Sequence, residues 1–355
     1  MRVVAGESAA RCIACSSHSH RRSHRSSTHG TPDLIKKCIL TGKFDYVNLH
    51  YHFFGSYHAS GYSDGAGGEG NAANVRLAKE KDMGVFIISP TDKGGALYRP
   101  SRTVADCVYP LSPIAFQCLY LWSQGCDTLS IGISKPSDFD EFVQASEMFK
   151  DWDGVKDTVS QAASKLRRVY TESVGKDFSE GYFEGVPTML EEKSQGVAVS
   201  HIIWLHGMVK GYGMLKFAQD RYQSLESASK NWKGRKDAKK NIAAFQSFNN
   251  GRAYDPGVDY DEVLEDAKYK EEIKRRMVEA HGWLNSNRKW TDDERRRLGC
   301  DEAYSLETWE SYPGDEPTIR GVILQNLSGG AVGSGGGQTP KSKKESKELR
   351  SFFNE

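Results

Sequence analysis

The chain has 355 residues, of which 38% are hydrophobic and 27% are charged, and its formal net charge is +1. This balance gives no global basic field for nucleic acid or an anionic membrane, and no apolar stretch is long enough to cross a bilayer. We therefore predict neither a nucleic-acid nor a membrane partner. The seven cysteines are scattered, and an odd number in a chain of this size argues against a disulfide framework. A reducing compartment, the cytoplasm, is the expected location.

Residues 1–26 are predicted to form a disordered basic leader. Arginine alternates with serine and histidine, Glu7 is the only acid, and an apolar face at helical spacing is lacking. An organellar transit peptide has a similar composition and is the alternative. Cys12 and Cys15 have CxxC spacing, but they fall in this leader outside any βαβ pattern, so we interpret the spacing as chance.

Residues 31–150 alternate between helical and strand patterns, as expected of a parallel sheet. The first helix has the clearest start, because Thr31 can cap it, Pro32 suits the first helical position and Asp33 complements the helix dipole. The predicted order is a helix over 31–42, a strand from 44, a Gly-rich loop over 55–70, a helix over 71–81, a strand from 85, a loop over 94–110, a helix over 112–124 and a strand from 129.

Beyond residue 150 the strand signal fades, and helices are predicted over 155–174, 197–225 and 261–283. The second of these has a broad apolar face that includes Trp204, which we assign to packing rather than to a cofactor site. A Gly/Ser linker and a Lys-rich tail close the chain. The predicted organisation is a leader over 1–26, an α/β unit over 27–150, a helical extension over 151–327, and the linker and tail over 328–355.

Each of the three apolar strand runs ends at a polar cluster. The runs lie at 46–51, 85–90 and 129–137, and a loop and a helical pattern follow each of them. Parallel strands whose carboxyl ends carry chemistry have this signature, as in α/β barrels. The ends of these strands are therefore the candidate functional site.

Three phrases at these strand ends resemble a branch of the aldo/keto reductase family. They read FDYVNLHY at 44–51, MGVFIISPTDKGG at 83–95 and SIGISKPSD at 130–138, and the similarity covers residues 27–142. The resemblance implies a (β/α)₈ TIM barrel that binds NADP(H) across its carboxyl face and reduces aldehydes or ketones to alcohols. For this chain it implies a partial barrel, the region of strands 5–8, followed by a mostly α-helical C-terminal extension.

The resemblance also implies cofactor-binding residues. They are Ser27, Thr28 and Asn48 for the nicotinamide carboxamide, Tyr51 for the nicotinamide ring, Ser89, Pro90, Lys93 and Gly94 for the pyrophosphate, Gly132 in the third phrase, and Ser134, Lys135, Asp138 and Glu141 for the adenosine and its 2′-phosphate. Phe142 departs from the family pattern, where asparagine is common, and this weakens the adenine contact.

The chemistry of these positions agrees with that assignment. Short polar side chains supply the donor and the acceptor that a carboxamide needs, and an aromatic ring suits the flat cationic nicotinamide. A helix that begins near Ser134 offers free N–H groups, and Lys135 adds a positive charge for a phosphate dianion. These features favour NADP over NAD.

The matched region contains no assigned catalytic acid. In the family the catalytic Asp, Tyr, Lys and His come from earlier strands, and residues 18–26 are too polar for the buried strand expected before Ser27. The α/β unit has about half of the roughly 250 residues of a complete barrel. Tyr98, His50 and His52 are candidates by proximity only, so we assign no catalytic residue. His50 and His52 form an HxH pattern, which we interpret as hydrogen-bonded strand-end histidines rather than as metal ligands.

The sequence thus predicts an aldo/keto reductase-like NADP-dependent oxidoreductase, truncated and catalytically impaired as given. Its partner would be a small carbonyl substrate. The alternative is a non-catalytic nucleotide-binding or interaction module built on a half-barrel, with association through an exposed sheet edge at Tyr46.

Overall fold

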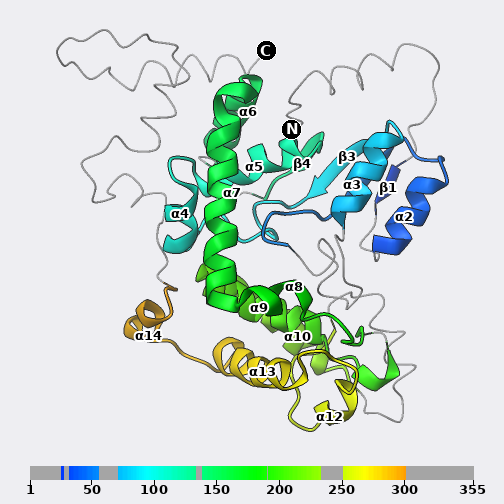
Figure 1. Cartoon of the computed structure of the whole chain (residues 1–355), viewed down its shortest axis with the longest axis vertical. Helices are drawn as coiled ribbons and strands as arrows, with labels where there is room; N and C mark the ends of the chain where they lie inside the picture. Colours follow the sequence, from blue (N-terminus) through cyan, green and yellow to red (C-terminus); the bar gives the residue numbers. More distant parts are fainter. Residues whose placement is uncertain are drawn as a thin grey trace.

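The computed structural model describes residues 32–55, 71–132, 138–189, 191–232 and 251–300, together with the backbone of 25–27. Over these residues the chain is a mostly helical α/β protein with a small parallel sheet (Figure 1). The α/β class predicted from the strand and helix patterns is confirmed.

The sheet consists of four short parallel strands in the order in which they occur along the chain. They are β1 (Arg25–Ser27), β2 (Tyr46–Leu49), β3 (Gly84–Ile88) and β4 (Thr128–Ser130). The register pairs Ser27 with Asn48, Asn48 with Phe86, and Phe86 with Thr128. All carboxyl ends therefore lie at one edge of the sheet.

The two faces of the sheet differ in burial. One face carries the fully buried Val47, Leu49, Val85 and Ile87, with Leu129 beside them. The side chains between them are half-buried or exposed, namely Tyr46, Asn48, Phe86, Ile88, Thr128 and Ser130. Parallel sheets usually have both faces covered. The second face is therefore the more accessible one, and Asn48 lies on it.

The helices that connect the strands are α2 (Pro32–Leu40), α3 (Asn71–Glu80), α4 (Arg102–Val108) and α5 (Pro113–Ser123), and α6 (Asp138–Lys150) follows β4. The predicted helices over 31–42, 71–81 and 112–124 are confirmed. The predicted loop over 94–110 is wrong in its second half, because α4 forms there. Ser101 caps α4 by accepting the Val104 N–H, and Val104 and Val108 are fully buried on one side of this helix.

The helical part contains α7 (Trp152–Val174), α8 (Lys176–Gly181), a 3₁₀ turn (Glu192–Ser194), α9 (Val199–Tyr212), α10 (Leu215–Ser229), α12 (Tyr260–Val263), α13 (Lys270–Leu284) and α14 (Asp292–Arg297). The long helix α7 runs from the sheet part to the helical part (Figure 1). It packs against α4, α5 and α6 and also against α9. The predicted helix over 155–174 is confirmed.

Two long predicted helices are each divided in the structure. The helix predicted over 197–225 breaks between α9 and α10 at Gly213, which has φ +67°. A Cβ at Gly213 would lie 2.1 Å from the carbonyl oxygen of Gly299, so glycine is needed for this corner. The helix predicted over 261–283 is α12 followed by α13, with Leu264 and Ala267 buried in the connection.

The amino-terminal boundary of the sheet also differs from the prediction. Strand β1 begins at Arg25, within the segment that we expected to be a leader, and Arg25 pairs with Tyr46. The sheet edge is therefore not at Tyr46; within the described chain the edges are β1 and β4. An edge strand needs only backbone hydrogen bonds, so a polar segment can form one. Residues 1–24, the loop over 56–70 and the predicted linker and tail lie outside the described residues.

The hydrophobic core is continuous between the sheet part and the helical part. One cluster of buried side chains contains Val47 and Ile87 of the sheet, Leu166 of α7, and Ile202 and Met277 of the helical part. Within the described ranges, no single helix has both the length and the apolar composition of a membrane span. Helices α4 and α5 pass such a test only as a pair that is bent by 57°.

Candidate functional site

The loops that follow β3 and β4 are tied together at the carboxyl edge of the sheet. The Ser89 N–H donates to the Ser130 carbonyl over 2.9 Å, and the Thr91 hydroxyl donates to the Gly132 carbonyl. The Lys93 N–H donates to the Ser89 carbonyl over 3.0 Å, which closes the loop into a tight turn. Five predicted cofactor residues, Ser89, Pro90, Lys93, Gly94 and Gly132, therefore lie in adjacent loops.

Two of these five residues are glycines in very close contacts. A Cβ at Gly94 would lie 2.0 Å from the Pro90 carbonyl oxygen and 3.0 Å from Cγ of His52. A Cβ at Gly132 would lie 2.7 Å from Cβ of Asp92. Real Cβ atoms do not approach other atoms this closely, so both positions need glycine for the loops to close.

Two of the three residues predicted to bind the carboxamide are neighbours. Ser27 and Asn48 are direct partners in the β1–β2 register. The Oδ1 atom of Asn48 is buried, and no group in the described part of the chain donates a hydrogen bond to it. A buried acceptor left in this condition costs about 1–3 kcal/mol. A ligand N–H placed here would remove that cost. Thr28, the third predicted residue, lies outside the described residues.

Tyr51 follows β2 and is buried, with its hydroxyl 3.5 Å from the hydroxyl of Tyr120. Burial, and next the neighbouring Tyr120, raise the pKa of Tyr51 above its ordinary range. The phenol therefore keeps its proton at neutral pH. Its ring can serve as a wall for a ligand, but its hydroxyl is a poor acid.

The two strand-end histidines are part of the local hydrogen-bonding structure. The Nε2–H of His52 donates to the Ile88 carbonyl over 2.9 Å, and the carbonyl of His50 accepts from the Asn71 amide over 2.8 Å. Burial lowers the pKa of His52 to about 4, so this ring is neutral at pH 7. The predicted hydrogen-bonded role is confirmed for His52. Over the ranges that the structure covers, no group of three or more His, Cys, Asp or Glu residues could hold a metal ion.

Tyr98 is the remaining proton-donor candidate, and its hydroxyl donates to Asp92 over 3.0 Å. Burial and then this contact with Asp92 raise the pKa of Tyr98 to about 12. A general acid works best with a pKa near the working pH. The pKa of Tyr98 is thus too high for efficient proton donation in carbonyl reduction.

The predicted adenosine end is only partly described, because Ser134 and Lys135 lie outside the described residues. Asp138 is the first residue of α6 and is fully buried, whereas Glu141 is half-buried. Of these two carboxylates, Glu141 is thus the one accessible to a ligand. Phe142 is buried against Trp122, with ring centroids 5.6 Å apart. The residue that departs from the family pattern is therefore a core residue.

A cavity that the sequence did not reveal lies where the sheet part meets the helical part. Its volume is ≈ 350 Å³, and its walls come from the loop after β2 and from α5, α7, α8 and α9. Trp204 contributes to one wall and donates its Nε1–H to the Phe54 carbonyl over 3.0 Å, which confirms that it packs against the sheet part. The lining residues come from five separate segments, so spacing along the chain gave no signal. We call this space the junction cavity.

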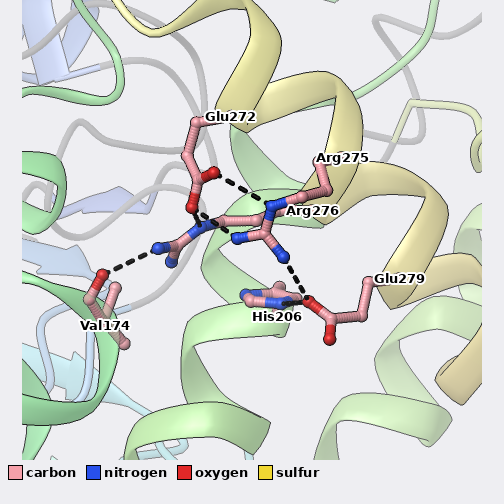
Figure 2. Close-up of polar contacts among 6 residues, drawn as sticks. All are labelled: Val174, His206, Glu272, Arg275, Arg276 and Glu279. Atoms are coloured by element: carbon pink, nitrogen blue, oxygen red, sulfur yellow. Dashed lines mark hydrogen bonds and ion pairs between the residues drawn. The ribbon is translucent and has the colours of Figure 1, made fainter.

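A charged cluster joins α9, α13 and the end of α7 (Figure 2). Arg276 donates from Nε to Glu272 over 2.6 Å and from its terminal nitrogen to the Val174 carbonyl over 2.8 Å. The neutral His206 ring donates its Nε2–H to Glu279 over 2.8 Å and stacks on Trp283. The side chain of His206 is 1% exposed, so no ligand reaches it. The cluster therefore holds α7, α9 and α13 together.

This cluster predicts a loss of stability in acid. Hydrogen bonds from Arg275, and next from Arg276, lower the pKa of Glu272 to about 2, and the His206 hydrogen bond lowers the pKa of Glu279. Both carboxylates stabilise the fold above their ordinary pKa of 4.5, and that stability is lost as pH falls through their lowered pKa values. Burial lowers the pKa of His206 below its ordinary 6.5, so its contribution also falls below that pH.

We therefore expect the free energy of unfolding to be nearly constant from about pH 8 to 6.5 and to fall steadily below that, as proton linkage requires. Urea denaturation at a series of pH values measures it. In the Glu272→Gln variant the part of the decline below about pH 4.5 should be shallower. A wild-type chain that becomes more stable between pH 6 and 3 would contradict this assignment.

No family model, curated protein or solved structure matches the chain.

Proposed function

We propose that this chain is an aldo/keto reductase-like protein that binds NADP(H) across the carboxyl ends of its parallel strands and serves the reduction of carbonyl compounds. Four parallel strands in sequential order, with helices in each connection, agree with part of a (β/α)₈ barrel. The observation that carries the proposal is the buried Oδ1 of Asn48, which lacks a donor in the described chain and lies in register with Ser27.

The residues present fit the cofactor at three places. A carboxamide N–H₂ would supply the donor that Asn48 lacks, and the ring of Tyr51 lies three residues further along the same segment. The turn with Ser89, Lys93 and Gly94 would hold the pyrophosphate, together with Gly132. Lys93 forms no ion pair within the described ranges, so its charge is available to a phosphate. When bound, NADPH supplies the hydride for carbonyl reduction.

The chain's own residues would bind and orient the cofactor. They would also have to supply the proton that carbonyl reduction needs. Carbonyl reduction needs a donor beside the hydride acceptor. Tyr51 and Tyr98 both have raised pKa values, and His52 is neutral with its Nε2–H committed to Ile88. We therefore expect weak or no oxidation of NADPH by this chain with an aromatic aldehyde. Robust turnover would mean that another group of the chain donates the proton.

Lys135 provides a test of the predicted preference for NADP. Lys135→Glu should weaken NADPH binding on the order of 10-fold or more, because it reverses a charge at the proposed 2′-phosphate site. NADH lacks this phosphate, so its affinity should change by less than about twofold. Equilibrium titration with each nucleotide measures both. Lys150→Glu, at the far end of α6, is the control and should change neither. Equal loss of NADPH and NADH binding would contradict the assignment.

The second candidate function is a non-catalytic nucleotide-binding module. It is favoured by the lack of a tuned proton donor among the described strand-end residues. The two candidates differ in one measurement, since both predict NADPH binding but only the oxidoreductase consumes NADPH with a carbonyl compound. Association through β1 or β4 would be limited by the length of these strands, which have three residues each.

A further inference from the structure

The junction cavity has the form of a ligand-binding site. Its volume of ≈ 350 Å³ is within the range of small-molecule pockets, which often occur between structural units and near the carboxyl ends of parallel strands. Most of the residues that line it are aromatic, among them Tyr51, Phe53, Phe54, Tyr120, Tyr170 and Trp204. Such walls favour a flat, apolar ligand.

The rim of the cavity carries a cation that is available to a ligand. Arg167 is exposed, and its guanidinium lies 5.4 Å from the centroid of the Phe53 ring. It makes no ion pair with a carboxylate in the part of the chain that the structure describes, whereas the next residue, Arg168, lies 4.0 Å from Glu172. A planar guanidinium held over an aromatic ring is suited to a carboxylate, which it can bind through two parallel hydrogen bonds.

Two further polar groups shape the cavity. Glu180 lines it and would repel an anion, so its effect on binding should be opposite to that of Arg167. His52 also lines it, and its buried Nδ1 has no hydrogen-bond donor within the described residues. Because Nε2 carries the proton of the neutral ring, Nδ1 is an acceptor, and like Glu180 it disfavours a carboxylate next to it, which leaves Arg167 as the site for an anion.

We propose that the junction cavity binds a planar aromatic carboxylate, with the ring system between the aromatic walls and the carboxylate on Arg167. The assignment goes beyond the NADP(H) proposal and does not depend on it. Of the predicted cofactor residues, Tyr51 alone lines the cavity. Binding can therefore be measured without any nucleotide, and failure of one proposal leaves the other standing.

The test is calorimetric titration of the full chain with 2-naphthoate and with the neutral 2-naphthamide. Naphthoate should bind at least about 5-fold more tightly than naphthamide, as expected for a charge-assisted contact at an exposed rim. Arg167→Gln should remove this preference, with a loss on the order of 5- to 10-fold for naphthoate and little change for naphthamide. Glu180→Gln should tighten naphthoate binding about twofold. Arg168→Gln is the matched control and should change neither ligand.

Thr171→Phe places a phenyl ring in the cavity and should weaken binding of both ligands on the order of 10-fold or more, with circular dichroism and thermal unfolding showing that the fold is kept. The proposal is overturned if naphthoate gives no saturable binding, if the amide binds as tightly as the acid, or if Arg167→Gln behaves like Arg168→Gln. It is equally overturned if Glu180→Gln weakens naphthoate binding, or if a folded Thr171→Phe chain binds both ligands as tightly as the wild type does. The two rim variants change exposed side chains, so the test does not depend on whether Thr171→Phe folds.

Discussion

Replacing Arg276 with alanine should lower the free energy of unfolding by about 3 kcal/mol, because it removes a buried guanidinium together with its charge-assisted and backbone hydrogen bonds. The guanidinium of Arg276 bonds Glu272 and the Val174 carbonyl, and it lies 3.9 Å from the centroid of the Phe178 ring. Its loss leaves the last carbonyl of α7 without this partner and opens space beside Phe178. Urea denaturation at pH 7 measures the change.

Arg275→Ala is the matched control for this prediction. Arg275 is the neighbouring residue and also bonds Glu272, but its side chain is 59% exposed. An exposed pair of this kind contributes about 0–1 kcal/mol. If Arg275→Ala and Arg276→Ala lower the free energy of unfolding by the same small amount, the cluster in Figure 2 does not hold α7 and α13 together.

Gly94→Ala should damage both the fold of the strand-end loop and its binding of NADPH. The added Cβ would lie 2.0 Å from the Pro90 carbonyl oxygen, and this atom belongs to backbone that cannot move without opening the turn. We expect a loss of about 2 kcal/mol in the free energy of unfolding, as for other overpacked sites. NADPH affinity should fall on the order of 10-fold or more, because opening the turn displaces the charge of Lys93 from the proposed pyrophosphate site.

Gly282→Ala is the control for the loop substitution. Gly282 is in α13, and a Cβ there would have no neighbouring atom within 4 Å. Alanine should therefore leave NADPH binding unchanged and stabilise the chain by up to about 1 kcal/mol. If Gly94→Ala binds NADPH as the wild type does, the turn after β3 does not hold the pyrophosphate.

Elements with local signals could be predicted from the sequence. Helices α2, α3, α5 and α7 could be predicted because their apolar spacing, and in some cases their caps, depend only on residues that are close together in the sequence. Helix α4 was missed because its seven residues are too few for a clear period. The break at Gly213 depends on the approach of Gly299, which is distant in sequence, and local patterns cannot show such a contact.

Some features of the candidate site could likewise be predicted from the sequence, and others could not. The common location of Asn48, Ser89 and Gly132 could be predicted, because parallel register brings strand ends to one edge of the sheet. Their cofactor-binding roles come only from the resemblance to the aldo/keto reductases. The burial of Asp138 and the core position of Phe142 depend on how α6 packs, and the junction cavity depends on how α7 and α9 meet the loop after β2. Tertiary packing decides these features, and the sequence pattern contains no direct signal for them.

In the proposed cofactor site, Asn48 binds the nicotinamide carboxamide. Titration of the wild-type chain and of Asn48→Leu with NADPH tests this role. Since Oδ1 of Asn48 is buried without a donor in the described chain, an apolar replacement should not lower thermal stability. We expect saturable NADPH binding to the wild type and a loss of about 5-fold or more in Asn48→Leu at unchanged or higher Tm. No binding to the wild type, or equal binding to a stable Asn48→Leu chain, would contradict it.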